Sequence, residues 1–284
     1  MTVSTSATRP APARPSLRRP DKFRPLFLDL AHSEWIKLWT VRSTYWTLLV
    51  TALGVVAAGA ALSGAYAKHY QGLSAAAKAA FDPAAYSLSG FFIGQLAIGT
   101  LGVVIITSEY TTGSIRTTLA AAPQRGMVLA AKATVFSVIA AVIGIVSSFC
   151  AFFLGQTLLA NKGLETHIGA PGALRSVIGT GLYLAVVGLL ALGLGALIRR
   201  TAGAIAVFVG LLLVVPVFFQ ALPAASQSAI TKFLPSDAGQ ALIGRTKFAP
   251  SSSLLSPWVG FAVFCAYTAV VLIVAFIALS RRDS

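Results

Sequence analysis

Residues 257–279 read PWVGFAVFCAYTAVVLIVAFIAL and contain no charged side chain. An α-helix rises about 1.5 Å per residue, so a stretch of this length can cross the roughly 30 Å hydrocarbon core of a bilayer. Five more apolar runs of comparable length precede it. They cover residues 44–65, 88–107, 128–160, 174–198 and 202–222. The sequence therefore predicts an all-α polytopic membrane protein with a six-helix transmembrane domain over residues 44–280.

The composition agrees with a lipid environment. Hydrophobic residues make up 56% of the 284-residue chain, charged residues only 11%, and the mean hydropathy is +0.81. A water-soluble domain of this size could not hide so much apolar surface. The run at 128–160 is longer than one crossing needs, so we expect it to tilt or to project from the membrane. Lys132, near its start, is expected to reach back to the interface.

The basic residues indicate the orientation. The chain has 22 Lys and Arg against 8 Asp and Glu, and alternate sides of the six runs carry 15 and 7 of those 22. Because Lys and Arg gather in cytoplasmic loops, both termini are predicted to be cytoplasmic in a multi-pass plasma-membrane protein. The positive charge is thus read as a topology signal, and no nucleic-acid partner is predicted. Membrane lipid is the expected surrounding.

Two segments precede the first run. Residues 1–25 are rich in Ala, Pro, Ser, Thr and Arg, have no signal-peptide core, and are predicted to be a disordered basic cytoplasmic tail. In residues 26–43, Leu28, Ala31, Trp35 and Leu38 recur at helical spacing, which predicts an amphipathic helix in the headgroup layer. The alternative is that these residues form the first turns of a long spanning helix. The long loop at 224–256 is expected to hold short re-entrant or surface helices.

Patterns typical of catalytic sites are missing from the sequence. No G-x-x-x-x-G-K-[ST] phosphate loop, H-E-x-x-H or G-x-S-x-G occurs, so we predict no enzyme activity, no catalytic residue and no cofactor or metal, with any ATP bound by another chain. The apolar runs also lack central Asp, Glu and His, which weakens the case for an ion-coupled carrier. Gln95, Gln156 and Gln220 suit hydrogen bonds between helices or contact with a substrate.

The link between the second and third runs is unusually patterned. Glu109, Gly113 and Arg116 can share one side of a short helix, and Ile115 and Leu119 form an apolar i, i+4 pair. Such a helix could insert its apolar pair into a groove on a soluble partner, with the charged residues at the edge. The alternative is an ordinary polar turn.

Three stretches carry a resemblance to a known family. They are EYTTGSIR at residues 109–116, SEWIKL at 33–38 before the first run, and LPSDAG at 234–239 before the last. They resemble the permeases of type 2 ATP-binding-cassette (ABC) exporters, in particular the single-domain six-helix form of actinobacteria. The similarity covers nearly all of the chain beyond residue 25.

This resemblance implies a permease subunit that exports a substrate using ATP hydrolysed by a separate ABC ATPase subunit, and that pairs with a second copy or a homologous permease. It implies a coupling helix that contacts the ATPase, containing Glu109, Gly113, Ile115, Arg116 and Leu119. It also implies an interfacial helix beside it, containing Glu34, Trp35 and Lys37. A secondary transporter or channel not driven by ATP remains the main alternative, followed by a membrane-embedded enzyme and a scaffolding or immunity protein. No residue identifies the substrate.

Overall fold

The structure, a computed structural model, describes residues 26–113, 125–220, 230–244 and 255–282. Within these ranges all regular structure is helical. The predicted tail at 1–25 lies outside the described residues. The helices are α1 (Phe27–Thr40), α2 (Arg42–His69), η1 (Tyr70–Gly72), α3 (Ala75–Ala79), α4 (Pro83–Leu88), α5 (Phe91–Thr111), α7 (Arg125–Ala160), α8 (Ala173–Ile198), α9 (Thr201–Val209), η2 (Gly210–Val214), α10 (Val215–Gln220), η3 (Thr231–Phe233), α12 (Pro235–Gln240) and α13 (Pro257–Arg282).

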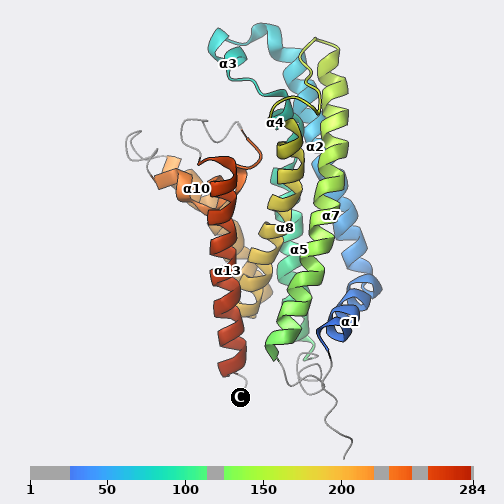
Figure 1. Ribbon diagram of the computed structural model, residues 1–284, viewed down its shortest axis with the longest axis vertical. Helices are drawn as coiled ribbons and strands as arrows, with labels where there is room; N and C mark the ends of the chain where they lie inside the picture. The colour runs from blue at the N-terminus through green and yellow to red at the C-terminus, as the bar shows by residue number, and fades with distance from the viewer. Residues whose placement is uncertain (1–25, 114–124, 221–229, 245–254, 283–284) are drawn as a thin grey trace, which may run out of the picture.

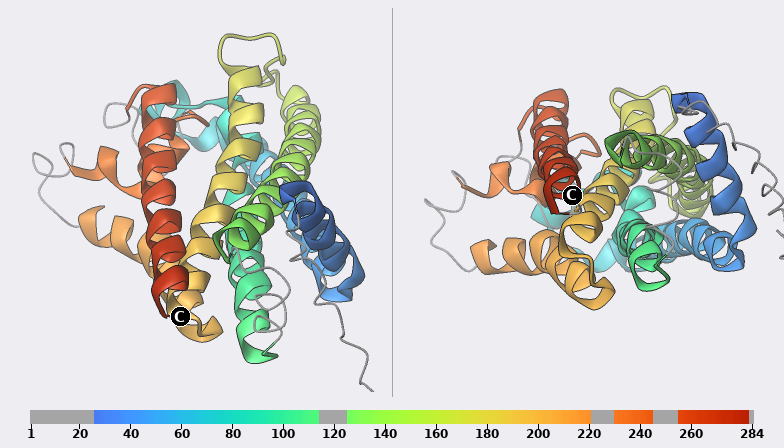
Figure 2. Two further views of the ribbon diagram at one scale, coloured as in Figure 1. Left: turned by 60° about the horizontal axis from the view of Figure 1, so that its bottom comes forward. Right: turned by 90° about the horizontal axis from the view of Figure 1, so that it is seen from below.

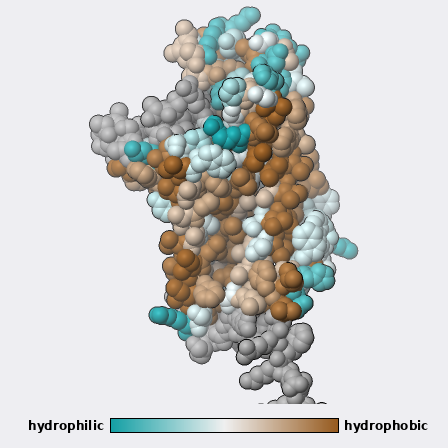
Figure 3. Space-filling model, viewed as in Figure 1, coloured by the Kyte–Doolittle hydropathy of each residue, from teal (hydrophilic) through white to brown (hydrophobic). Residues whose placement is uncertain are grey.

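Among the described residues, six helical units are long and apolar enough to cross a membrane, which confirms the predicted fold class. They are α2 with η1, α4 with α5, α7, α8, α9 with η2 and α10, and α13. Figure 1 shows them side by side, with α1 and the C-terminus at one end of the bundle and α3 and α4 at the other. On the face that Figure 3 shows, apolar side chains predominate between these two ends, and hydrophilic residues gather mainly toward the ends. This is the surface pattern of a protein that spans a bilayer.

Helix α8 forms the centre of the bundle. It packs most extensively on α5 and α7 and then on α13. Figure 2 shows α8 between α13 and α9 on one side and α5, α7, α2 and α1 on the other. By contrast, α13 and the α9–α10 unit bury little of their surface within the chain.

Glycines allow several helices to touch through their backbones. A Cβ atom on Gly90 would lie 1.9 Å from the Val55 carbonyl oxygen in α2, and one on Gly94 would lie 2.6 Å from the Val55 side chain. Gly181 of α8 crosses α7 in the same way, since a Cβ there would lie 2.5 Å from the Ile145 backbone nitrogen. The close packing expected of small residues in membrane helices is therefore present.

Buried polar side chains join the helices. The Tyr183 hydroxyl of α8 donates to Gln95 Oε1 of α5 at 2.6 Å. Gln156 of α7 donates to Ser87 Oγ of α4 at 2.9 Å and accepts from the Thr166 backbone at 2.7 Å. These contacts favour the packing role for Gln95 and Gln156 over contact with a substrate. The side chain of Gln220 lies outside the described residues.

Two features depart from uniform α-helix. The fifth spanning unit contains the π-helical turn η2 just before Pro216, a residue that cannot donate the normal helical hydrogen bond. The loop before α13 contains the short helices η3 and α12, as predicted for part of this segment. Residues 221–229 and 245–254 of the same loop lie outside the described ranges.

Helix α1 is separate from α2. Val41 between them is extended, at φ −87° and ψ 109°, so the two helices do not form one continuous rod. Helix α1 is thus an element of its own, and the alternative of a single long helix is wrong. The Leu26 backbone N–H donates to the Asp29 carboxylate at 3.0 Å, which supports the start of α1.

The side of α1 that contacts the bundle differs from the predicted apolar stripe. Leu30, Glu34 and Leu38 are buried, mainly against α7, whereas Leu28 and Trp35 are exposed. Only Leu38 of the predicted stripe is fully buried. The exposed Leu28 and Trp35 are free to contact lipid, and the position of α1 in the headgroup layer stays a prediction. The charged Glu34 instead points inward, where it needs a partner.

Candidate functional site

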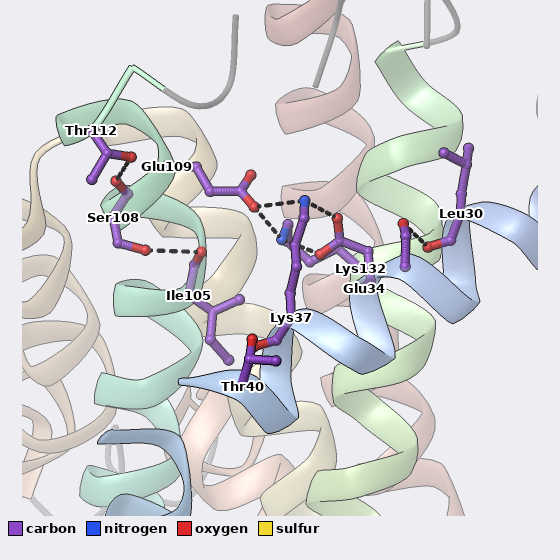
Figure 4. A network of polar contacts seen from close by, with 10 residues as sticks. Leu30, Glu34, Lys37, Thr40, Ile105, Ser108, Glu109, Thr112 and Lys132 are labelled. Atoms are coloured by element: carbon purple, nitrogen blue, oxygen red, sulfur yellow. Dashed lines mark hydrogen bonds and ion pairs between the residues drawn. The ribbon is translucent and has the colours of Figure 1, made fainter. Parts of the chain in front are cut away.

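Four charged side chains meet at the α1 end of the bundle, and we call them the charge cluster. Glu34 and Lys37 come from α1, Glu109 from α5 and Lys132 from α7. Figure 4 shows the two lysine ammonium groups between the two carboxylates. Lys132 pairs with both Glu34 and Glu109, the latter at 2.8 Å. Lys37 pairs with Glu34 at 2.7 Å and with Glu109 at 3.3 Å.

The charge cluster is neutral as a whole and mostly buried. The side chains of Glu34 and Lys132 are 2% and 3% exposed, Glu109 is 13% exposed, and Lys37 is 43% exposed. Desolvated charges are stable only when they are paired and hydrogen bonded, and here each carboxylate has two ammonium partners. The cluster therefore fixes the relative positions of α1, α5 and α7.

Lys37 remains charged across the physiological pH range. Partial burial lowers the pKa of Lys37, but the hydrogen bond and the charge of Glu34, followed by those of Glu109, raise it more. The net pKa lies above the ordinary value of lysine. The exposed corner of the charge cluster is therefore not a pH switch near neutrality.

The other side of the same α5 turn is also fixed. The Arg199 guanidinium lies over the Tyr110 ring, 5.1 Å from its centroid, and the Thr201 hydroxyl donates to Thr107 Oγ1 at 2.8 Å. Arg199 adopts a left-handed conformation with φ 59°, which costs about 1–2 kcal/mol for a residue with a side chain. The end of α5 is thus connected to α1 and α7 through Glu109, and to the α8–α9 turn through Tyr110 and Thr107.

The prediction that a separate short helix begins at Glu109 is wrong. Helix α5 continues through Glu109 to Thr111, and Gly113 then turns the chain with φ 70°. Glu109 and Gly113 are therefore not on one side of a separate helix. Ile115, Arg116 and Leu119 lie outside the described residues, so their predicted contact with an ATPase stays a prediction.

The pairing of Lys132 was not predicted. From the sequence this side chain was expected only to reach back to the interface, whereas the structure buries it against Glu34 and Glu109. Two features of the sequence could have indicated this pairing. Lys132 is a single lysine inside an otherwise apolar run, and Glu34 and Lys37 lie three residues apart in the predicted amphipathic helix. Such a pattern calls for an opposite charge nearby.

Within the described ranges, no group of three or more His, Cys, Asp or Glu side chains comes together to hold a metal ion. The chemistry available at the charge cluster is that of buried ion pairs. Such pairs can fasten helices and transmit movement between them, but they offer no activated nucleophile.

Residues 28–284 match the family described as ABC-2 family transporter protein. The match begins in α1 and continues through α13, so it includes the entire charge cluster. No curated protein matches the chain.

Proposed function

The chain belongs to the ABC-2 family of transporter proteins and is a permease subunit of an ABC transporter, and from this premise we propose that it exports a substrate across the plasma membrane. The energy comes from ATP hydrolysed by a separate ATPase subunit. The family constitutes the membrane component of the transporter rather than its ATPase. Six apolar helical units provide the membrane domain that such a subunit requires.

The charge cluster is the observation that carries the proposed coupling to the ATPase. It connects α1, α5 and α7 directly beside Gly113, where the chain leaves α5 for residues 114–124. A force applied to that link reaches three helices at once, because buried ion pairs resist separation. We propose that ATP-driven closure of the ATPase subunits moves this end of the permease, and that the bundle follows largely as a rigid body.

The remaining parts of the proposal concern orientation and assembly. The start of α1 and the end of α13 lie at the same end of the bundle (Figure 1), and the surplus of basic residues favours the cytoplasm for that end. A second permease, either another copy or a homologue, would complete the transport path. The apolar surfaces that α13 and the α9–α10 unit leave uncovered supply the area for such contacts or for lipid.

A secondary transporter or channel is the second candidate function. Ion-coupled carriers place ionisable groups along a path near the middle of the membrane. The four ionisable groups of the charge cluster lie instead at one end of the bundle and neutralise one another. This arrangement favours a mechanical role over an ion pathway.

Co-purification with the partner tests the proposed function. The double variant Arg116→Ala/Leu119→Ala is expected to reduce recovery of a co-expressed ABC ATPase by about tenfold, because it removes a charged and an apolar anchor from the link. Neither residue belongs to the charge cluster, so membrane insertion should be unchanged. Lys162→Ala, an exposed substitution at the opposite end of the bundle, is the matched control. Equal ATPase recovery with the unmodified chain, the double variant and the Lys162→Ala control would refute the proposed contact.

A further inference from the structure

A polar cavity of about 270 Å³ lies at the end of the bundle opposite the charge cluster. It is bounded by the start of α4, the start of α8 and the loop that joins α7 to α8, with Gly244 on a further side. Its chemistry is unusual because both an arginine and an aspartate line it without forming an ion pair. The lining includes Asp82, Thr166, Gly172, Arg175 and Ser176.

Arg175 lacks a partner in the part of the chain that the structure describes. Its Nε atom is buried and makes no hydrogen bond, and the residue takes part in no ion pair with the described carboxylates. A buried donor without an acceptor costs about 1–3 kcal/mol, more when the group is charged. Gly172 leaves room for the guanidinium, since a Cβ there would lie 3.2 Å from one of its terminal nitrogens. Arg175 also lies in the first turn of α8, where the backbone dipole favours a negatively charged ligand.

Asp82 supplies the opposite charge. One of its oxygens, Oδ1, accepts from the backbone N–H groups of Ala84 and Ala85 at 3.0 and 3.2 Å and so caps α4. The other oxygen, Oδ2, faces the side of Gly244, 3.8 Å from where a Cβ would stand. The same Cβ position is 3.6 Å from Ser176 Oγ of α8. Asp82 Oδ2 and the start of α8 therefore line the same cavity.

We propose that this cavity binds a small zwitterion, with a phosphate or carboxylate on Arg175 and an amine on Asp82. A purely anionic ligand would satisfy the guanidinium but would face the aspartate, and a purely cationic one would face Arg175. A ligand carrying both charges gives the buried Arg175 Nε an acceptor and Asp82 Oδ2 a donor. The volume suits a headgroup-sized molecule such as phosphoethanolamine, either free or as the head of a lipid. This inference goes beyond the proposed function and does not depend on the ATPase.

Binding of O-phosphoethanolamine to the full chain in nanodiscs tests the proposal, with phosphatidylethanolamine in the nanodisc as the second arm. Arg175→Gln removes the guanidinium without breaking a described contact, and Asp82→Asn removes the charge while keeping a residue that can cap α4. Each variant is expected to weaken binding about tenfold or more, and Lys162→Gln should leave it unchanged.

The two arms separate the sources of the ligand. Binding of the free compound identifies a soluble zwitterion, and stabilisation by the lipid alone identifies a headgroup; both support the proposal. Methyl phosphate binding as tightly as O-phosphoethanolamine, with Asp82→Asn having no effect, would show a plain anion site and overturn it. Absence of response in both arms would overturn it as well.

Discussion

Replacing Lys132 with methionine is expected to lower the free energy of unfolding by about 3–5 kcal/mol, because it leaves buried carboxylates without their main partner. Glu34 is 2% exposed and Glu109 13% exposed, so water cannot replace the lost ammonium group. Methionine keeps the length of the side chain and its helix propensity, which limits the change to the charge. Equilibrium unfolding in mixed micelles measures the effect.

Two controls separate pairing from packing. Lys37→Met removes a lysine that is 43% exposed, and its effect should be about 1 kcal/mol or less. The triple variant Glu34→Gln/Glu109→Gln/Lys132→Met removes the buried charges together and should recover much of the stability, since the loss comes from unpaired charge. If Lys132→Met were as stable as the unmodified chain, the charge cluster would not hold these helices.

Gly90→Val is expected to have a comparably large effect on folding. The new Cβ would lie 1.9 Å from the Val55 carbonyl oxygen and 2.7 Å from its carbon, so α2 and α5 could not keep their contact. Overpacking against backbone commonly costs 1–3 kcal/mol, and a contact this short should reach about 3 kcal/mol or more. We expect little monodisperse protein in size-exclusion chromatography after detergent extraction.

Gly64→Ala is the matched control for this prediction. It lies in α2, the helix that Gly90 touches through Val55, but its Cβ would meet only Leu158 Cδ1, at an ordinary 3.8 Å. Alanine should stabilise the helix there by up to about 1 kcal/mol. Recovery of Gly90→Val protein at the level of Gly64→Ala would show that α2 and α5 can separate without cost.

The membrane-spanning elements were predictable because their signal is local. A run such as 257–279 is decided by length and apolarity alone, and α13 begins at Pro257 as the end of the preceding polar loop indicates. The separation of α1 from α2 was left open by the sequence, since no proline or glycine stands at the break. It depends on Val41 adopting an extended conformation, which helical periodicity does not encode.

The charge cluster was not predictable because it joins residues far apart in the chain. Lys132 and Glu34 are separated by 98 positions, and Lys37 and Glu109 by 72. The sequence showed a glutamate in a polar link and a lysine at the edge of an apolar run, and both were expected to face outward. Only the packing of α1 against α7 next to the end of α5 brings them together. The family resemblance singled out the segment that begins at Glu109, but it could not indicate that Glu109 faces inward.

Site-specific photo-crosslinking from Thr112 tests the central claim most directly. This exposed residue follows α5 and precedes the Gly113 turn, so a photoreactive amino acid there should crosslink to a co-expressed ABC ATPase. The same probe at Lys162, at the opposite end of the bundle, should not. A crosslink from Lys162 instead of Thr112 would contradict the proposed orientation, and no ATPase crosslink from Thr112 would contradict the proposed coupling through the end of α5.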